Sequence, residues 1–503
     1  FSRGTPAPGA RPVAAIGRLL RPETIGIIGV SEKRNIGRII LENILKNGFP
    51  RDKIFVVKPG LSEIAGCRCF PSVRELPVTV DMFVLTLGAE QSVGLMREIA
   101  ENAKARSVIL IAGGLGEKEG SQGLEEEIRT IIAAGRAAGR ITPVVNGGNC
   151  LGIASKPGKY DTTFIPEDKL PRPRGPRSDM AVISQSGAFM ISRMSKTPRI
   201  EPRYAVSLGN QIDLTASDYL EFLKDESEVR TFAVYMEGFR PGDGHAFARA
   251  VKEITAAGRA VIVYKSGRSP EGRGAASSHT ASVAGDYSVC RAILEQAGAV
   301  VCGDIEEYEN MVRGFEALVD KKTGGNRVGL LSNAGFECVV MADSLKGDGG
   351  GLELAAFSAD TGARIAAALR PLGIDKLQDV HNPLDVTPVA DDAAFIGCVE
   401  AVLEDPGVDC AVISPVPMTP AMRTLPASAE GGRGILDPES FAQRIITLFR
   451  RTDKPFVVNV DAGTVYDPLC DLLDAAGIPV FRRSDEALRF LRRYVAARRN
   501  DRS

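Results

Sequence analysis

The chain has 503 residues, too many for one hydrophobic core and enough for about three domains of ordinary size. Lys and Arg number 62 and Asp and Glu 63, for a formal net charge of -1, which argues against nucleic acid and anionic membranes as partners. The nine scattered cysteines form no disulfide or zinc pattern and favour a reducing cytoplasm, and no apolar run predicts a membrane span.

The first part of the chain alternates short β-branched runs with amphipathic segments. Residues 1–15 are rich in Pro, Gly and Arg and are expected to form a flexible tail. Strands are predicted in "TIGIIGV", "KIFVVKP", "VDMFVLTL", "SVILIAGG" and "TPVVNGG", with helices between them. This alternation is typical of a parallel sheet with crossover helices and predicts a first domain over residues 16–155.

A glycine-rich turn follows the first predicted strand, where Gly26, Gly29 and Gly37 lead into a helix. Such a turn offers backbone N–H groups to a phosphate, although the spacing is not that of the dinucleotide fingerprint. The next strand ends in Lys58 and Pro59, where a nicotinamide enzyme places an acidic residue on the ribose. A cation there suits a ribose phosphate, so coenzyme A and NADP both stay open at this point.

Two further domains are predicted after a Pro-rich and charged segment, "SKPGKYDTTFIPEDKLPRPRGPRSD", which is expected to be a surface connection. The alternation restarts at "MAVISQSGAFMISRM" and predicts a second domain of flavodoxin-like size over residues 176–305. It restarts again at "RVGLLSNAG" and predicts a third domain over residues 325–494. Because both restarts pair a strand with a following helix, we expect the two domains to be structural repeats.

His279 is the one histidine of three whose surroundings suit a nucleophile. His245, near a helix start, and His381, beside a turn, are expected to have structural roles. His279 stands in "SGRSPEGRGAASSHTASVAGDYSV", predicted to be a long loop of small residues before a helix that begins near Asp286. Small residues let backbone amides approach an anion, and a neutral imidazole can attack phosphorus. A phosphohistidine is therefore reasonable, whereas no second ligand supports a metal.

Two features would complete a phosphoryl site. The strand "TFAVYMEGF" delivers Glu237 past its C-terminal end, where the carboxylate would bond one imidazole nitrogen and leave the other free. The alternative is an ordinary charge at a strand end. The "SQSGA" turn opens a helix whose positive N-terminal end would face the phosphoryl group. The candidate phosphate-binding residues are Ser184, Ser186, Gly187, Ala188, Ser278 and Thr280.

Several longer motifs occur in a characteristic order. They are "GVSEKRNIGRIILENILKNGF" with "VVKPG", "AGGLGE", "GGNCLGI", "SQSGAF", "SLGNQIDL", "YMEG", and "KSGRS" followed by "AASSHTASVAGDYSV". With these motifs the chain resembles, from about residue 16 to 494, the α-side of the NDP-forming acyl-CoA synthetases, which are relatives of succinyl-CoA synthetase.

The resemblance implies an α/β fold with an N-terminal Rossmann-like CoA-binding domain and two flavodoxin-like ligase domains. It implies that acyl-CoA and phosphate yield an acyl phosphate, that the phosphoryl group moves to His279, and that a mobile phosphohistidine loop delivers it to ADP or GDP. Run in reverse, the steps make a thioester from a carboxylic acid, CoA and ATP. Glu237 would steady His279. The residues expected to bind coenzyme A are Gly29, Ser31, Arg34, Ile36, Gly37, Lys58, Pro59, Gly114, Glu117 and Asn149.

The sequence departs from the family at three places. Residues 147–149 read "GGN" where the family has Gly-Pro-Asn, and Ala281 replaces the glycine that ends the family's "SHTG" motif. In the third domain a glycine-rich turn has become "SNAGFEC", which places Phe336, Glu337 and Cys338 where an anion would approach. We therefore expect the third domain to serve assembly or acyl selection.

No ATP-grasp module with paired lysines and magnesium-binding carboxylates is recognised in the sequence. The resemblance implies that ATP or GTP and Mg²⁺ bind a separate ATP-grasp β-subunit, in a cytoplasmic heterotetramer of two α and two β subunits. A small carboxylic acid or acyl-CoA would be the substrate. One alternative is a noncatalytic CoA-binding regulatory or scaffold subunit. Another is an NADP-dependent dehydrogenase, which leaves the second and third domains unexplained.

Overall fold

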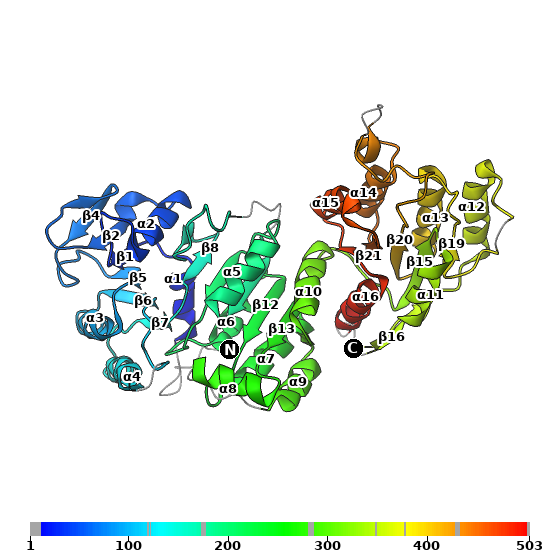
Figure 1. Ribbon diagram of the computed structural model, residues 1–503. Coiled ribbons are helices and arrows are strands. Elements are labelled where there is room, and N and C mark those ends of the chain that lie inside the picture. The colour runs from blue at the N-terminus through cyan, green and yellow to red at the C-terminus, as the bar shows by residue number, and fades with distance from the viewer. Residues whose placement is uncertain are drawn as a thin grey trace. The chain divides into compact units, whose positions relative to one another are not determined.

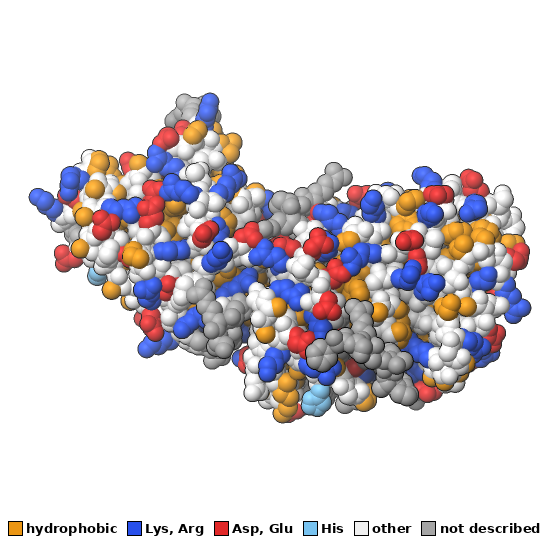
Figure 2. Space-filling model, turned by 180° about the vertical axis from the view of Figure 1, so that it is seen from behind, with side chains coloured by type: hydrophobic (Ala, Val, Ile, Leu, Met, Phe, Trp, Pro, Cys, Tyr) orange, Lys and Arg blue, Asp and Glu red, His pale blue; other side chains and the backbone are white. Residues whose placement is uncertain are grey.

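The computed structural model describes residues 12–117, 120, 122–172, 178–279, 286–347, 350–376, 379–427 and 433–499 (Figure 1). The chain divides into two compact units, one ending at Tyr308 and the other beginning at Glu309. Within the described part, no helix combines the length and the apolar character needed to cross a membrane. On the face drawn in Figure 2, basic and acidic side chains are interspersed, in keeping with the net charge of -1.

The first sheet lies in the first unit and has the strand order β3-β4-β2-β1-β5-β6-β7. All its neighbours pair in parallel except β3 and β4. When the short edge strand β3 is left out and the other six strands are renumbered along the chain, their order across the sheet is 3-2-1-4-5-6. This is the doubly wound arrangement of Rossmann folds. The strands are β1 Ile25–Ile28, β2 Ile54–Val57, β3 Glu63–Ile64, β4 Cys67–Phe70, β5 Val80–Leu85, β6 Ala105–Leu110 and β7 Val144–Gly147; the crossover helices are α2 Ile36–Lys46, α3 Ala89–Glu101 and α4 Gln122–Ala137.

The second sheet belongs to the same unit and has the order β14-β13-β12-β10-β11-β8-β9. Its five parallel strands follow the flavodoxin-like order 2-1-3-4-5. Two antiparallel edge strands, β8 and β9, complete the sheet; β8 ends at Ser155, the first residue of the segment predicted to be a surface connection, and β9 lies within that segment. The strands are β8 Ile153–Ser155, β9 Tyr160–Asp161, β10 Met180–Ser184, β11 Tyr204–Ser207, β12 Thr231–Met236, β13 Ala260–Lys265 and β14 Val300–Val301; the helices are α5 Gly187–Lys196, α6 Ala216–Leu223, α7 Asp243–Ala256, α8 Pro270–His279 and α9 Tyr287–Gln296. Helix α10, Ile305–Ala317, begins in the first unit and continues past Tyr308 into the second.

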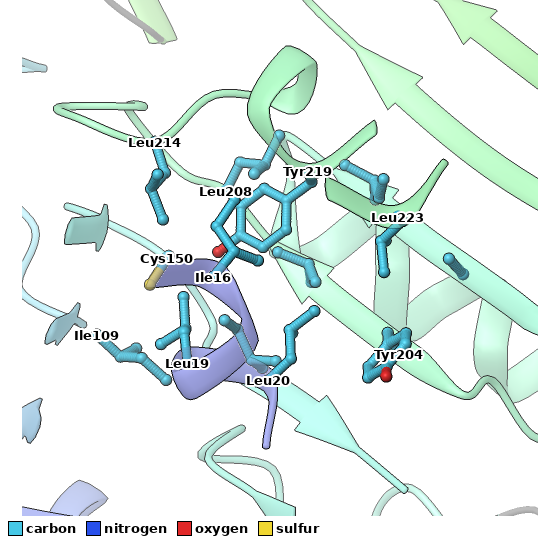
Figure 3. Close-up of a cluster of buried hydrophobic side chains, with 14 of the residues drawn as sticks. Ile16, Leu19, Leu20, Ile109, Cys150, Tyr204, Leu208, Leu214, Tyr219 and Leu223 are labelled. Carbon is cyan, nitrogen blue, oxygen red and sulfur yellow. The ribbon is translucent and has the colours of Figure 1, made fainter. Parts of the chain in front are cut away.

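The two sheets of the first unit share one hydrophobic core through the short helix α1, Ile16–Leu20. Figure 3 shows Leu19 of α1 between Ile109 of β6 and Tyr219 of α6, and all three side chains are fully buried. The predicted tail, residues 1–15, is described only from residue 12, and Val13–Ala15 form a 3-10 helix that leads into α1.

The third sheet lies in the second unit and has the order β18-β15-β20-β21-β22, again 2-1-3-4-5, with β19 paired to the end of β15. The predicted α/β fold, with a Rossmann-like domain followed by two flavodoxin-like domains, is therefore confirmed. The strands are β15 Arg327–Ser332, β18 Glu353–Leu354, β19 Leu384–Asp385, β20 Cys410–Ser414, β21 Phe456–Asn459 and β22 Val480–Phe481, with a hairpin of β16 Lys346–Gly347 and β17 Gly350–Gly351; the helices are α11 Gly335–Asp343, α12 Ala359–Leu369, α13 Asp392–Glu404, α14 Phe441–Arg451, α15 Asp467–Ala475 and α16 Ser484–Arg499.

The expectation that a long loop precedes Asp286 is wrong for residues 270–279, which form helix α8. The side chain of Ser269 accepts a hydrogen bond of 3.0 Å from the Gly272 N–H, as an N-cap residue does. Pro270 suits the first helical position, and the alanines that follow have the strongest helix propensity. These local signals outweigh the glycines that made the segment look like a loop.

Glu337 lies on the first turn of α11 and is fully buried, so the "SNAGFEC" turn of the third sheet exposes only Phe336 of its last three residues. The hydroxyl of Ser414, at the end of β20, donates to Glu337 Oε2 at 3.0 Å, and Asn459 Nδ2, at the end of β21, lies 3.4 Å from the same oxygen. Burial raises the pKa of the Glu337 carboxyl above its ordinary value of 4.5.

Glu337→Gln tests this raised pKa. Above pH 4.5 the unfolded chain loses a proton that the folded chain still binds, so this residue costs stability progressively as pH rises. We expect the variant to be more stable than the wild type at about pH 8, and the gain to shrink near the ordinary pKa of a carboxyl. Urea unfolding of the full chain at the two pH values measures this. An equal difference at both would contradict a raised pKa.

Candidate active site and coenzyme A edge

The turn after β1 is closed by Asn35, the N-cap residue of α2. Its side-chain oxygen accepts a hydrogen bond of 2.9 Å from the Arg38 N–H, and its Nδ2 donates to the Gly29 carbonyl at 2.8 Å. Gly29 has a φ of 91°, and a Cβ on Gly37 would lie 2.5 Å from the Gly29 oxygen. Glycine is therefore required at both positions. Sequence reasoning missed Asn35, although asparagine before an amphipathic helix is a common cap.

The other residues predicted to bind coenzyme A follow parallel strands of the first sheet and so lie along the same carboxyl edge. Lys58 directly follows β2, is half-buried, and its N–H donates to the Phe70 carbonyl at 2.8 Å. Pro59 and Arg34 are exposed, and Arg34 lies 3.8 Å from the carboxylate of Asp168. Ser31 is half-buried in the β1–α2 turn, Ile36 is exposed at the first position of α2, and Gly114 follows β6.

Glu117 and Asn149 stand where the first sheet meets the second. The two carboxylate oxygens of Glu117 accept hydrogen bonds from the Leu115 N–H at 2.6 Å and from Asn210 Nδ2 at 2.7 Å. The Asn149 N–H donates to the Ala112 carbonyl at 2.7 Å. These hydrogen bonds of Glu117 therefore connect the turn after β6 to the turn after β11. The sequence did not indicate this contact.

The "SLGNQIDL" segment, residues 207–214, holds this junction together. Backbone N–H groups of Asn210 and Ile212 donate to the carbonyls of Gly148 and Gly147, both at 2.8 Å. On the same segment, Asp213 accepts two hydrogen bonds, of 2.8 and 2.6 Å, from the guanidinium of Arg136 on α4. The carboxyl edges of the two sheets are thus joined by paired backbone and by a bidentate ion pair.

Three adjacent parallel strands of the second sheet, β10, β12 and β13, end at one edge, and Gln185, Glu237 and Ser266 are the residues that follow them. The side-chain oxygen of Gln185 accepts hydrogen bonds from the N–H groups of Glu237 at 2.7 Å and Gly238 at 3.1 Å. The amide of Gln185 therefore fixes the main chain that carries Glu237. Gln185 lies within the "SQSGA" motif but was not among the predicted site residues.

The side chain of Glu237 is buried, with 7% of its surface exposed. Its Oε1 accepts a hydrogen bond of 3.1 Å from the Tyr235 hydroxyl. Its Oε2 is buried and has no hydrogen-bond partner among the described residues. An acceptor left open in this way costs free energy unless a donor reaches it, so this oxygen is suited to receive an N–H group.

Lys265, the last residue of β13, is almost completely buried, with 2% exposed. Its ammonium donates to the carbonyls of Glu237 at 2.7 Å and of Ser266 at 2.6 Å. Burial lowers the pKa of Lys265, and the nearby Cys290 and Glu237 partly oppose that change. The residue was not predicted to belong to the site; the one signal was a lysine that ends the apolar strand "AVIVYK".

The first turn of α5 carries the predicted phosphate-binding residues of the "SQSGA" turn. Ser186 caps the helix, and its hydroxyl oxygen accepts a hydrogen bond of 3.3 Å from the Phe189 N–H. Ser184 is buried, and its hydroxyl donates to the Ser186 carbonyl at 2.6 Å. A Cβ on Gly187 would lie 2.6 Å from the Cβ of Leu151, and Ala188 is exposed. A helix N-terminus of this kind carries N–H groups that could bind an anion.

Helix α8 leads from the end of β13 to His279. A hollow of 470 Å³ lies at its start, lined by Tyr264, Ser266, Gly267, Arg268, Ser269 and Gly272. The side chains of Ser278 and His279, and the whole of Thr280 and Ala281, lie outside the described residues. His245 on α7 and His381 are both exposed. In the described ranges no three His, Cys, Asp or Glu side chains are grouped to hold a metal ion.

Lys265→Met tests the buried ammonium. Because its pKa is lowered from 10.5, the unfolded chain binds the proton more tightly, and the penalty that this charge imposes on folding fades as pH rises towards 10.5. We expect the free energy of unfolding of the wild type, measured relative to the variant, to rise between about pH 8 and about pH 10. Urea unfolding of both chains gives this difference, and a value independent of pH would contradict the lowered pKa.

Comparison with known proteins agrees with this arrangement. The family described as CoA binding domain matches residues 23–156, and the family described as Succinyl-CoA ligase like flavodoxin domain matches residues 177–315. The chain is 30% identical over 470 residues to the acetate–CoA ligase (ADP-forming) II subunit alpha of Pyrococcus furiosus, covering 92% of this chain and 94% of that protein. It is also 30% identical over 487 residues to the I subunit alpha of the same organism, covering 94% and 96%.

A solved structure has the same fold over nearly the whole chain. It is the dinucleotide-forming acetyl-coenzyme A synthetase 1 of Ca. Korarchaeum cryptofilum in complex with phosphate and ADP, with a TM-score of 0.81 and 25% identity, covering 97% of this chain and 98% of that chain.

The fold and these matches define an acid–thiol ligase with a CoA-binding domain followed by a succinyl-CoA ligase-like domain. The chain belongs to the ADP-forming acyl-CoA ligases, and within that family to the α-subunits. This confirms the family resemblance predicted from the motifs.

Proposed function

We propose that the chain interconverts acyl-CoA, phosphate and ADP with a carboxylic acid, CoA and ATP through a phosphorylated His279. The observation that carries the proposal is the buried carboxylate of Glu237, whose Oε2 has no partner among the described residues, beside the strand that leads through α8 to His279. Glu237 accepts a hydrogen bond from one imidazole nitrogen of His279 and leaves the lone pair of the other nitrogen free to attack phosphorus.

The proposed reaction has three steps. An oxygen of inorganic phosphate attacks the thioester carbonyl, the C–S bond breaks, and CoA leaves as the thiol once its sulfur has taken a proton. The imidazole then attacks the phosphorus of the acyl phosphate, and the carboxylate leaves. A terminal oxygen of ADP finally attacks the phosphorus of the phosphohistidine, the P–N bond breaks, and ATP forms while the imidazole regains its lone pair. Glu237 opposes the positive charge on the ring while the phosphoryl group is attached, and the N-terminal end of α5 opposes the charge of the phosphoryl oxygens.

Coenzyme A is proposed to bind along the carboxyl edge of the first sheet. The turn around Gly29 and Gly37 has the tight backbone that a phosphate requires, and Lys58 offers a cation beside the ribose. The predicted domain ranges 16–155, 176–305 and 325–494 assign this site to the first domain, His279 to the second, and assembly or acyl selection to the third.

The partner is proposed to be a separate ATP-grasp β-subunit that binds ADP or ATP with Mg²⁺. The support is that the two Pyrococcus furiosus relatives are named as subunits alpha and that the chain covers at least 94% of each. The proposed assembly is a cytoplasmic heterotetramer of two α and two β subunits, acting on a small carboxylic acid.

His279→Ala tests the phosphohistidine. The chain is co-purified with its native partner, mixed with γ-labelled ATP and Mg²⁺, and analysed for alkali-stable, acid-labile phosphate on this polypeptide. We expect the wild type to take up label and the variant to take up none. His245→Ala is the matched control, because His245 is exposed on α7, and it should be labelled like the wild type. Label on His279→Ala would refute the mechanism, and an unlabelled wild type would favour the noncatalytic alternative.

Lys58→Glu tests the coenzyme A edge. Reversing this charge should weaken CoA binding by about 10-fold to 100-fold, because a charge-assisted hydrogen bond to the ribose phosphate is lost. Binding of dephospho-CoA, which lacks the 3′-phosphate, should change far less. Lys53→Glu is the control, since Lys53 is exposed just before β2, at the opposite end of that strand. Calorimetric titration measures all the affinities. Equal losses for the two ligands would exclude a contact between Lys58 and the 3′-phosphate, and tight NADP binding would favour the dehydrogenase alternative.

A further inference from the structure

The polar atoms of Glu237 are each held by a different neighbour, with one exception. Its N–H donates to Gln185, its carbonyl accepts from Lys265, and its Oε1 accepts from the Tyr235 hydroxyl. The exception is the buried Oε2, for which the described residues supply no partner. The first two contacts fix the main chain, and among the described residues the hydrogen bond from Tyr235 is the one that reaches the carboxylate itself.

Tyr235 is itself rigidly placed on β12. Its ring stacks on that of Phe189, with centroids 4.0 Å apart and planes at 17°, and the ring of Tyr264 lies 5.9 Å away on the neighbouring strand. Its hydroxyl also lies 3.3 Å from the hydroxyl of Ser266. Burial raises the pKa of Tyr235, so the hydroxyl keeps its proton and remains a donor at neutral pH.

A carboxylate turns easily about its last torsion angle, because such sp³–sp² torsions have broad minima. Without a donor on Oε1, the two oxygens of Glu237 would exchange places and present a range of orientations. The hydrogen bond from Tyr235 removes this freedom and directs the open Oε2 in one direction. A fixed acceptor lowers the cost of orienting an incoming N–H donor.

We propose that Tyr235 is a positioning residue of the phosphoryl-transfer reaction, which acts by orienting Glu237 so that Oε2 receives the imidazole N–H of His279. This inference rests on the proposed function. It assigns to the tyrosine of the "YMEG" motif a role separate from that of the glutamate, because the phenol bonds the carboxylate and makes no contact with the reacting phosphorus.

Tyr235→Phe is the test, because it removes the hydroxyl and keeps the ring that stacks on Phe189. In single-turnover labelling of the holoenzyme by γ-labelled ATP, phosphorylation of His279 should slow by about 10-fold to 100-fold, the effect of one hydrogen bond to a charged group. The half-saturating concentration of CoA should stay within about twofold. Tyr308→Phe is the control: its ring belongs to the same cluster, 5.5 Å from Phe189, and its buried hydroxyl makes no described contact with Glu237.

A double-mutant cycle separates positioning from a general effect on packing. If Tyr235 acts through Glu237, the same Tyr235→Phe change should cost less than about twofold in a Glu237→Gln background. Equal slowing in both backgrounds, or equal slowing by Tyr308→Phe, would overturn this inference and leave the phosphohistidine proposal standing. A wild type without label, or label that survives in His279→Ala, would overturn both together.

Discussion

The parallel pairing of β10, β12 and β13 is the constraint on which the candidate active site depends. Ser184 pairs with Tyr235, and Met236 pairs with Lys265, so the three strands end within a residue or two of one another at one edge. The side chains that follow can then reach across the strand ends, as the Gln185 amide does. A catalytic group placed on such strands inherits the rigidity of the sheet, which a loop could not provide.

The same region contains two buried charges, and removing them from water costs free energy. Lys265 and Glu237 are both almost completely removed from water, and each alone would carry a large desolvation cost. They attract one another, and the ammonium also saturates two backbone carbonyls at the strand ends. The two charges thus reduce the cost of burying each other, and one carboxylate oxygen of Glu237 is left without a partner in the described part of the chain.

Much of this fold could be predicted because apolar β-branched runs mark the parallel strands, and the glycine-rich turn after β1 marks a Rossmann-like start. The edge strands β8 and β9 were hidden by the prolines and charges around them. Helix α8 was hidden by its glycines, although Ser269 and the alanines carried a helical signal. Glu237 could be predicted because it stands just past a strand. Lys265 could not, since only the register of β12 and β13 brings it beside Glu237. Tyr235 lies two residues before Glu237 and so shares its face of the strand, a spacing that was present in the sequence but was not used.

Helix α1 joins the two sheets of the first unit into one hydrophobic core, although the predicted domain boundary separates the sheets. Its leucines are packed by both the first and the second sheet, so they belong to neither alone. Severing the chain between residues 156 and 176 would divide the covalent backbone but not the apolar interior, and each fragment would expose surface that the other now covers. The CoA-binding domain therefore cannot be cut out as an independently folding part. Loss of structure in one sheet should spread to the other, so that both unfold in a single cooperative event.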